Sequence, residues 1–379
     1  MKVLHLRDYY LGITFLYYIL KGLDGNHKIL VRRVDKKDIE MFPDVEVITI
    51  HWFYRLLNFF DNILRGLIRS DHKLFNFTRG HQRVIDHECP DILHAHMGHE
   101  GLYCLPLALS TELPFVVTFY GADLALDYYP YWRRHMPAVY ARGDAFIVEG
   151  PAMKKMLVTL GVQKNKIHVI EIPILPEKIP LKSSFYHKDK LKIFMCATFV
   201  EKKGIDIAIQ ALAQLNVDYE VYIVGSGPLE SVYRSMIKDL GVEENFIFHG
   251  RKKYTEVYEI ALNCDVFLHP SKLALNGDTE GGAPTVIIEM QYLGLPIVAT
   301  THADIPHVVI DSDYLCTENS VVELVASLEK FIANWRGHNV LHISNLENNR
   351  KQILAKHSST IIANKYQALY GSLLESRTC

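Results

Sequence analysis

Cysteine and tryptophan are scarce in this chain, and neither sign of charge dominates. The 379 residues include 6 cysteines and 3 tryptophans, and the formal net charge is −2. The cysteines are scattered with no C-x-x-C pair, which predicts buried free thiols in a reducing compartment. A charge so close to zero excludes the bulk attraction on which nonspecific nucleic-acid binding depends.

A signal peptide and a membrane-spanning run are also missing from the N-terminal region. The apolar stretch 11–20 has only ten residues, whereas a transmembrane helix needs about 20. We therefore expect a buried helix there and a cytoplasmic protein. The chain contains no internal repeat and no low-complexity tract.

Apolar stretches of strand length alternate with helical patterns along the chain. Hydrophobic residues make up 49% of it, enough for large cores. The expected strands are 3–6, 29–31, 45–49, 92–96, 115–119, 145–148 and 167–170, then 192–197, 219–224, 246–249, 266–269 and 296–300. This alternation predicts an α/β fold of parallel sheets covered by helices on both faces.

The chain length and a proline-containing polar segment predict two domains. A chain of 379 residues exceeds a typical single domain. Residues 173–190 contain three prolines and a polar, charged run, which indicates a linker. We therefore expect domains at 1–172 and 191–357, followed by a helical pattern in 358–379. Ligands bind at the carboxyl ends of strands in such sheets, so the site is expected in the cleft between the domains.

The most informative stretch is 278–289, in which an acid, a glycine pair and a proline precede a short apolar helix. The helix should begin at Pro284 or Thr285 and end before Gly294. A helix N-terminus binds anions, and an adjacent carboxylate can accept hydrogen bonds from sugar hydroxyls. The stretch therefore indicates a nucleotide-sugar site. The alternative is a glycine turn and a helix N-terminus that serve stability alone.

The stretch resembles the donor signature of the retaining glycosyltransferases of family 4, especially enzymes of bacterial exopolysaccharide and lipopolysaccharide synthesis. The segments 200–204, 224–229, 249–251 and 264–271 resemble family segments in the same order, so the resemblance covers most of residues 190–310. It implies the GT-B architecture, two doubly wound Rossmann-like domains facing a cleft, with a C-terminal helix that returns to the first domain. Glu230 replaces the third glycine of a dinucleotide fingerprint, which argues against an oxidoreductase.

The resemblance also implies roles for residues of the second domain. Lys203 would contact the donor diphosphate and neutralise charge on the leaving group. Glu280 would contact the sugar and Glu289 the ribose. The remaining donor-binding residues that it implies are Thr198, Gly225, Gly227, Arg251, Gly282, Ala283, Pro284 and Thr285.

In the first domain, segments 94–98 and 118–123 resemble family segments that face the cleft. They imply a catalytic role for Tyr120. The acceptor-binding residues implied there are His96, Gly121 and Asp123, with Gly12 in the glycine turn after the first strand.

A metal site is an alternative interpretation of the histidines in this region. His94, His96 and His99 lie close in sequence, and alternate strand residues share a face. The family transfers sugars without a metal, however. We therefore expect no metal and no cofactor beyond the nucleotide-sugar co-substrate.

The chain departs from the family pattern in three ways. Thr198 stands where an arginine is usual, and Lys202 or Arg251 are candidates to supply the missing charge. Tyr120 replaces a histidine and cannot become a cation at neutral pH. Glu280 and Glu289 are separated by eight residues instead of seven.

Residues Tyr54–Ile85 combine apolar side chains at helical spacing with interleaved arginines and a lysine. One interpretation is a helix that packs its apolar stripe on the sheet. The other is a basic amphipathic helix on an anionic membrane surface, which would suit a lipid-linked acceptor and a peripheral position on the inner face of the membrane.

These observations predict a cytoplasmic, metal-independent, retaining glycosyltransferase that uses a nucleoside-diphosphate sugar and a glycan or lipid-linked acceptor in surface polysaccharide synthesis. Within the enzymes, a nucleotide-sugar epimerase or a phosphorylase of the same architecture is the alternative. A non-catalytic assembly subunit that keeps the fold is the alternative from another class, and the departures at Thr198 and Tyr120 are its support.

Overall fold

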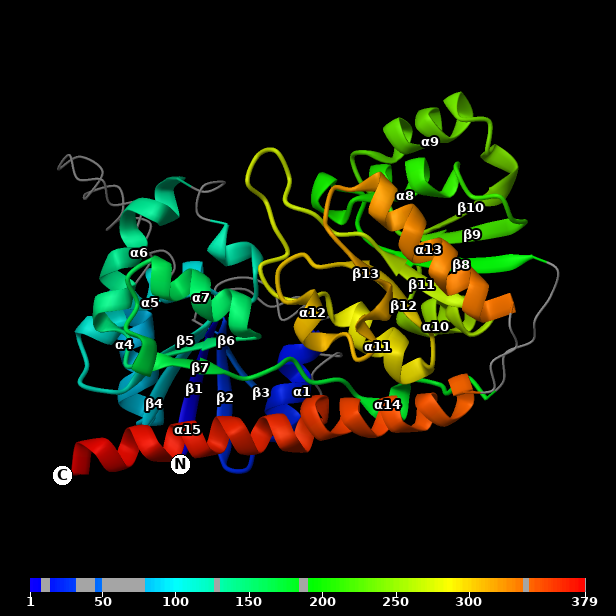
Figure 1. Cartoon of the computed structure of the whole chain (residues 1–379). Helices are drawn as coiled ribbons and strands as arrows, with labels where there is room; N and C mark the ends of the chain where they lie inside the picture. Colours follow the sequence, from blue (N-terminus) through cyan, green and yellow to red (C-terminus); the bar gives the residue numbers. More distant parts are fainter. Residues whose placement is uncertain are drawn as a thin grey trace. The chain divides into compact units, whose positions relative to one another are not determined.

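The computed structural model describes residues 1–7, 14–31, 45–49, 79–125, 130–183, 190–336 and 341–378. The chain forms two compact units. Unit 1 comprises residues 1–173 and 359–379, and unit 2 comprises residues 174–358. Each unit contains one parallel sheet with helices on both faces (Figure 1).

The sheet of unit 1 has the order β3-β2-β1-β4-β5-β6-β7. Its strands are β1 (Lys2–Arg7), β2 (Asn26–Val31), β3 (Glu46–Thr49), β4 (Ile92–His96), β5 (Phe115–Thr118), β6 (Ala145–Val148) and β7 (Ile167–Val169). Every pairing is parallel, and His5 on β1 lies opposite His94 on β4. The central strands are buried on both faces and are largely apolar, with the buried polar residues His5, His94 and His96 as the main exceptions.

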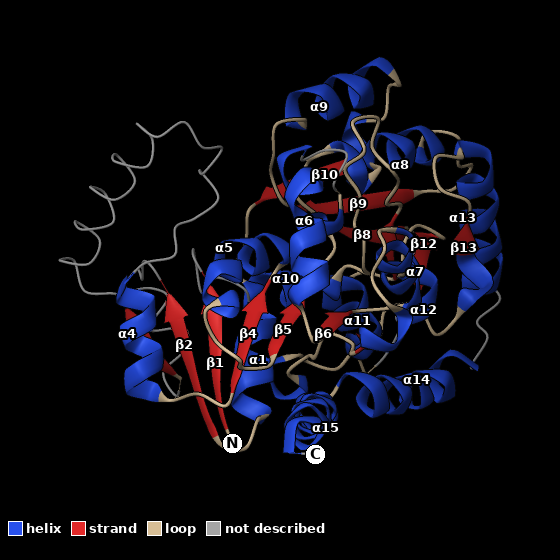
Figure 2. Ribbon diagram, turned by 90° about the vertical axis from the view of Figure 1, so that its left-hand side faces the viewer, coloured by secondary structure: helices blue, strands red, loops and turns tan. Residues whose placement is uncertain are grey.

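Two groups of helices cover this sheet (Figure 2). On one face lie α4 (Arg79–Glu88), α5 (Gly98–Leu109), α6 (Pro130–Arg142) and α7 (Pro151–Thr159). On the other lie α1 (Thr14–Gly22) and the C-terminal α15 (Ser359–Thr378), whose Ile362, Tyr366 and Tyr370 pack with Val3, Ile29 and Ile92. Since side chains alternate along a strand, His5 and His94 share this second face with Val3 and Ile92.

The sheet of unit 2 has the order β10-β9-β8-β11-β12-β13. Its strands are β8 (Leu191–Cys196), β9 (Tyr219–Val224), β10 (Phe246–Gly250), β11 (Val266–His269), β12 (Ile297–Thr300) and β13 (Leu315–Cys316). One face is covered by α8 (Ile205–Leu212), α9 (Glu230–Asp239) and α13 (Val321–Arg336). The other is covered by α10 (Tyr254–Leu262), α11 (Thr285–Leu293), α12 (Ile305–Val308) and α14 (Leu341–His357).

The expected α/β fold and its twelve strands are confirmed, with boundaries that shift by up to three residues. The strand β13 was not expected, because two residues are too short for a periodic pattern. The stretch 174–183, expected to be a linker, packs on unit 2. Ile174, Leu175 and Ile179 are buried there, and Lys182 Nζ donates to the Leu262 and Cys264 carbonyls at 2.8 and 2.5 Å.

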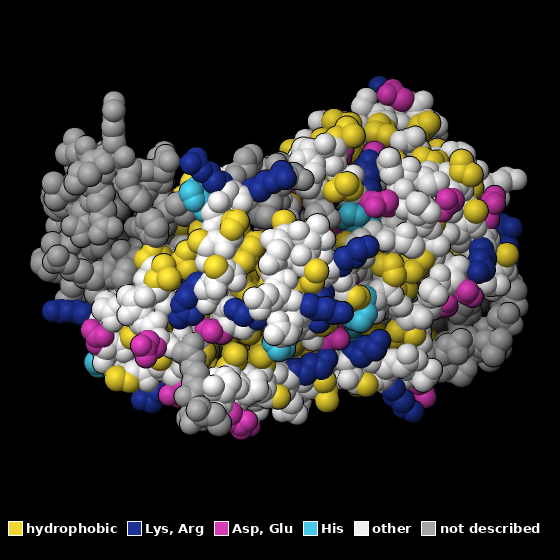
Figure 3. Space-filling model, turned by 60° about the vertical axis from the view of Figure 1, so that its left-hand side comes forward, with side chains coloured by type: hydrophobic (Ala, Val, Ile, Leu, Met, Phe, Trp, Pro, Cys, Tyr) yellow, Lys and Arg dark blue, Asp and Glu magenta, His cyan; other side chains and the backbone are white. Residues whose placement is uncertain are grey.

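Of the segment Tyr54–Ile85, the structure describes only residues 79–85, which belong to α4. The proposed membrane contact of this segment therefore lies mostly outside the described residues. No helix among the described residues is long and apolar enough to cross a bilayer. Acidic and basic side chains both occur across the coloured surface in Figure 3, in keeping with the near-zero net charge.

Three buried histidines of unit 1, His5, His94 and His96, predict a pH-dependent stability. Burial first, and neighbouring histidines second, lower the pKa of each, that of His94 to about 3. In the unfolded chain a histidine binds its proton near pH ~6.5. The unfolded state therefore binds more protons below that pH. The free energy of unfolding should decrease as the pH falls from 6.5, by at most about 1.4 kcal/mol per pH unit for each histidine.

Urea unfolding of unit 1 between about pH 5 and 7.5 measures this slope. Trp335 belongs to unit 2, so tryptophan fluorescence in a Trp335→Phe background follows unit 1. His94→Gln should remove about a third of the slope, because one of the three histidines is lost. A stability of unit 1 that is flat below pH 6.5 would contradict the neutral state of these histidines.

Candidate active site

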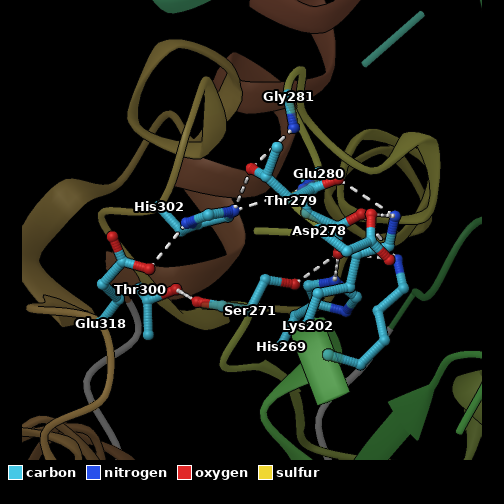
Figure 4. Close-up of polar contacts among 11 residues, drawn as sticks. Lys202, His269, Ser271, Asp278, Thr279, Glu280, Gly281, Thr300, His302 and Glu318 are labelled. Atoms are coloured by element: carbon cyan, nitrogen blue, oxygen red, sulfur yellow. Dashed lines mark hydrogen bonds and ion pairs between the residues drawn. The ribbon is translucent and has the colours of Figure 1, made fainter. Parts of the chain in front are cut away.

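The signature residues form the loop between β11 and α11, residues 270–284, called here the β11–α11 loop. β11 lies between β8 and β12 in the middle of the unit 2 sheet. The loop leaves the carboxyl end of that strand, where sheets of this kind bind ligands. Polar contacts join it to the segments that follow β8, β12 and β13 (Figure 4).

An ion pair between Lys203 and Glu280 is the centre of this network. Lys203 ends the short 3-10 helix η5 (Glu201–Lys203), which follows β8. Its Nζ donates to Glu280 Oε1 at 2.7 Å and to Oε2 at 2.8 Å, and Ser271 Oγ donates to Oε1 at 2.7 Å. The structure thus brings together the two residues to which the resemblance assigns the diphosphate and the sugar.

The Glu280 side chain is charged although only 8% of it is exposed. Burial alone would raise its pKa, but the Lys203 ammonium and then the neighbouring His269 outweigh burial and hold the pKa well below its usual range. A carboxylate that keeps its charge in a dry site can accept hydrogen bonds from sugar hydroxyls more strongly than a neutral acid.

A second set of contacts holds the backbone of the loop. Glu318 Oε2 accepts from His302 Nδ1 at 2.7 Å and from the Leu273 N–H at 2.6 Å. His302 Nε2 in turn lies 2.9 Å from Thr279 Oγ1 and accepts from the Glu280 N–H at 3.3 Å. Since Nε2 accepts, the proton of a neutral His302 is on Nδ1. The orientation of Glu280 therefore depends on residues outside the loop.

Lys202 pairs with the β11–α11 loop. Its Nζ donates to Asp278 Oδ1 and to the Thr279 carbonyl, each at 3.0 Å. Thr198 and Arg251 are both exposed at the ends of β8 and β10. Of the two candidates for the missing arginine, Lys202 is therefore engaged within the loop, whereas Arg251 faces solvent.

Glycine is required where these loops touch. A Cβ on Gly225 would lie 1.8 Å from the Ala197 carbonyl oxygen, and one on Gly204 would lie 1.8 Å from that of Pro270. Both residues also have positive φ, 136° and 62°. A Cβ on Gly227 would lie 2.6 Å from the Phe199 oxygen. The glycines let the loops after β8, β9 and β11 approach one another backbone to backbone.

Helix α11 begins at Thr285 and ends before Gly294, as expected, with Pro284 at its N-cap. Ala283 is buried just before the helix. The Gly282 N–H donates to the Glu280 carbonyl at 2.9 Å. The Gly282 N–H therefore serves the turn, a role that the resemblance to donor-binding segments did not indicate.

Glu289 lies inside α11 and is 8% exposed. Burial raises its pKa to about 7, and a hydrogen bond with Tyr258 on α10 offsets only part of that rise. Glu280 and Glu289 therefore differ in charge state at neutral pH. The difference arises because the Lys203 ammonium accompanies Glu280, whereas Glu289 has a hydrogen bond with the neutral phenol of Tyr258.

In unit 1 the expected residues gather at the carboxyl ends of β4 and β5. His96 ends β4, and its Nδ1 lies 2.7 Å from the Tyr120 hydroxyl. Gly121 has a φ of 97° and caps the 3-10 helix η2 (Ala122–Leu124). Asp123 is 1% exposed and accepts from the Gly98 and Tyr120 N–H groups at 2.7 and 3.0 Å. Its carboxylate thus holds the segment that carries Tyr120, while Gly12 lies outside the described residues.

The histidines that lie close together in the structure are not the three that were considered as an alternative metal site. His5 joins His94 and His96, and one ring nitrogen from each lies within 4.8 Å of the other two. His99 is instead stacked on Trp132, and its Nε2 lies 3.6 Å from Glu100 Oε1. The alternative triad of His94, His96 and His99 does not form, because Gly98 begins α5 and His99 therefore leaves the strand face that His94 and His96 share.

The sequence also contains one Asp-x-Asp pair, Asp311 and Asp313. Asp311 caps the 3-10 helix η7 (Ser312–Tyr314), and Asp313 lies 3.5 Å from Lys330 Nζ. Both line a cavity of about 360 Å³ that also involves Pro296. They precede β13 and therefore lie at the amino edge of the sheet, opposite the β11–α11 loop.

Several residues of the two sites were missed by the sequence analysis. They are Ser271, His302, Glu318 and Tyr258 in unit 2, and His5, His27, Tyr366 and Tyr370 in unit 1. Tyr370 is 276 residues from its partner His94. No local pattern signals such contacts, because each residue type is also common in ordinary cores.

Both units match known protein families. A family model described as "Glycosyl transferases group 1" matches residues 178–352, and one described as "Glycosyltransferase Family 4" matches residues 30–178. The amylovoran biosynthesis glycosyltransferase AmsK of Erwinia amylovora is 30% identical over 253 residues, which are 63% of this chain and 60% of that protein. The match spans only about three fifths of the length of such curated relatives.

Solved structures share the fold. HepE of Anabaena in complex with UDP-glucose has a TM-score of 0.74 at 18% identity, over 98% of this chain and 100% of that one. The apo lipopolysaccharide outer core galactosyltransferase WaaB has a TM-score of 0.72 at 14% identity, with the same coverage. Likeness at these identities shows the GT-B fold alone. Together with the two family models, it shows that this chain belongs to the family 4 glycosyltransferases.

Proposed function

We propose that this protein is a retaining glycosyltransferase of surface polysaccharide synthesis. It moves a sugar from a nucleoside-diphosphate sugar to a glycan or lipid-linked acceptor. The observation that carries the proposal is the ion pair between Lys203 and Glu280 of the β11–α11 loop, where a cation and a charged carboxylate meet. Relatives named for amylovoran biosynthesis, and a structural neighbour solved with UDP-glucose, support the same class.

The geometry suits both halves of a nucleotide sugar. An ammonium has three N–H donors, and the two contacts of Lys203 with Glu280 leave one for a phosphate oxygen. A carboxylate has about four lone-pair directions, so Glu280 keeps capacity for a sugar hydroxyl. Glu289, one helical turn into α11, is the group proposed for the ribose.

The proposed reaction exchanges one glycosidic bond for another. An acceptor hydroxyl attacks the anomeric carbon while the bond from that carbon to the diphosphate breaks. The electrons of the broken bond leave with the diphosphate, whose developing charge Lys203 stabilises. A donor phosphate oxygen takes the acceptor proton on the face from which the diphosphate leaves, so the anomeric configuration is retained. The protein acts mainly by positioning and charge stabilisation.

A donor panel tests the proposal. Purified protein is mixed with nucleoside-diphosphate sugars, beginning with UDP-glucose, and thermal unfolding is followed. A donor at 100 times its Kd should stabilise the protein by about 2.7 kcal/mol. The anomer formed is then identified by NMR. An epimerase would change the donor without an acceptor, a phosphorylase would require phosphate, and a non-catalytic subunit would do neither.

Lys203→Met should lower the turnover of UDP-glucose by a factor on the order of 10²–10³, the usual effect of losing one preorganised charge donor. Lys272→Met is the matched control. Lys272 Nζ lies 2.6 Å from Asp206 Oδ2, so this change also breaks a shielded ion pair of unit 2 but leaves Glu280 untouched. Unfolding of both variants is measured alongside kcat. Normal turnover by Lys203→Met would rule out the diphosphate role.

Glu289→Ala should weaken UDP binding by roughly 1.5–3 kcal/mol, because a charged hydrogen-bond partner of the ribose is lost. The pKa of Glu289 is about 7 without ligand. Its ionised, better accepting form therefore increases as the pH rises through 7, and UDP affinity should rise with it. Calorimetry across this range checks the slope. The Glu289→Gln variant removes this titration and retains that of the UDP phosphate, so identical slopes in the two proteins would exclude Glu289 from the site.

Transfer should survive EDTA. Lys203 is proposed to supply the positive charge at the diphosphate, and the single Asp-x-Asp pair lies at the opposite edge of the sheet. Turnover of UDP-glucose is measured after dialysis against EDTA and again after magnesium is added. Complete inactivation that magnesium reverses would overturn the metal-independent reaction.

A further inference from the structure

A continuous series of hydrogen bonds crosses unit 1 and ends at Tyr120. It begins at the Asp24 carbonyl, which lies 3.1 Å from His27 Nε2. His27 Nδ1 lies 3.1 Å from His5 Nε2, and His5 Nδ1 lies 2.9 Å from His96 Nε2. His96 Nδ1 then lies 2.7 Å from the Tyr120 hydroxyl.

The first member of this series sets its direction. A backbone carbonyl can only accept, so His27 must donate from Nε2. A neutral imidazole carries one N–H, which leaves His27 Nδ1 as an acceptor for His5 Nε2–H. The same reasoning makes His5 Nδ1 accept from His96 Nε2–H. His96 Nδ1 is then an acceptor, and the Tyr120 hydroxyl must donate to it.

His94 lies beside this series and has hydrogen-bond partners of its own. Its Nε2 lies 2.7 Å from Thr118 Oγ1, and its Nδ1 lies 2.7 Å from the Tyr370 hydroxyl. Both partners are hydroxyls, which can donate or accept, so these contacts do not set the tautomer of His94. Every donor in the series points towards Asp24.

We propose that this directed series fixes the Tyr120 hydroxyl as a hydrogen-bond acceptor towards a sugar ligand. His96, His5 and His27 are then positioning residues that act through Tyr120. Its one proton is committed inward, so Tyr120 can take a hydrogen bond from a sugar hydroxyl but cannot give one to a phosphate. The nature of the ligand rests on the proposed function, whereas the direction of the series does not.

The environment of the imidazoles suits this arrangement. His5, His94 and His96 have no exposed surface, and burial lowers their pKa values. They are therefore neutral at pH 7, as the series requires, because a charged imidazole has two donors and would break it. Aligned hydrogen bonds also polarise and strengthen one another in a medium of low dielectric constant.

Hydrogen bonding favours this series over a metal site built from the same residues. The ring nitrogens of His5, His94 and His96 all have hydrogen-bond partners within the protein. Each ring would therefore have to give up a hydrogen bond to bind a metal ion, because both of its nitrogens have partners. Zinc binding is therefore an outcome that the test must be able to detect.

The test is the tautomer of each histidine in the full chain. Histidine-labelled protein is studied by long-range ¹H–¹⁵N NMR at neutral pH, with signals assigned by single substitutions. His27, His5 and His96 should all carry the proton on Nε2. An Nδ1–H tautomer or a doubly protonated ring at any of the three would overturn the proposal. So would one equivalent of zinc that binds and shifts the His5, His94 and His96 signals together.

Two variants of His27 provide the matched comparison. His27→Gln keeps an oxygen to accept from His5 and an amide N–H to donate to Asp24, so His5 and His96 should keep the Nε2–H form. His27→Leu removes the acceptor of His5, and both rings should lose the uniform Nε2–H form. If His5 and His96 keep the Nε2–H tautomer in a folded His27→Leu protein, His27 does not set the direction of the series, and the proposal is contradicted.

A Tyr120→Phe variant separates this proposal from the proposed function. The direction is set from Asp24, so His27, His5 and His96 should stay Nε2–H after the phenol is removed. A reversal of these three would contradict the proposal. If the tautomers are as expected but no nucleoside-diphosphate sugar binds or turns over, the proposed function fails and the directed series stands.

Discussion

Burial of both faces of two parallel sheets is the constraint on which the rest of this structure depends. Strands such as β4, β5, β8 and β11 are paired on both sides and covered above and below, so their own positions favour apolar residues. Polar groups that recognise a ligand must then collect where the strands end. The Tyr120 segment and the β11–α11 loop both begin at carboxyl ends, one in each unit.

The ionisation of each buried carboxyl group in unit 2 depends on the side chains next to it. Glu280 keeps its negative charge because Lys203 donates to both of its oxygens, and Ser271 adds a third hydrogen bond. Glu289 is buried against Tyr258 without a comparable cation, and its pKa rises to about 7. One site thus contains a permanent anion and a carboxyl group that titrates near neutrality, a pairing typical of functional sites.

Unit 1 departs from the apolar rule on one sheet face. His5 and His94 lie on the same buried sheet face as Val3 and Ile92, and the aromatic side chains of α15 cover this face. Such polar groups are tolerated in a core only when their hydrogen bonds are complete. His27 and His96 complete those of His5, and Tyr370 completes those of His94 from the C-terminal helix together with Thr118. The last helix is therefore needed for the polar interior of the unit as well as for its packing.

The sequence by itself determined the fold and part of the site, because both depend on local pattern. Strand and helix periodicity predicted the two sheets, and Pro284 with Gly294 predicted the limits of α11. The family motifs pointed to Lys203 and Glu280, although 77 residues separate them. Only the tertiary structure decided that these two form an ion pair, that Gly282 and Asp123 serve the backbone, and that His5 replaces His99 beside His94. His302, Glu318 and Tyr370 could not be foreseen, because a hydrogen-bond partner is chosen by proximity in the folded chain, which residue type and spacing do not encode.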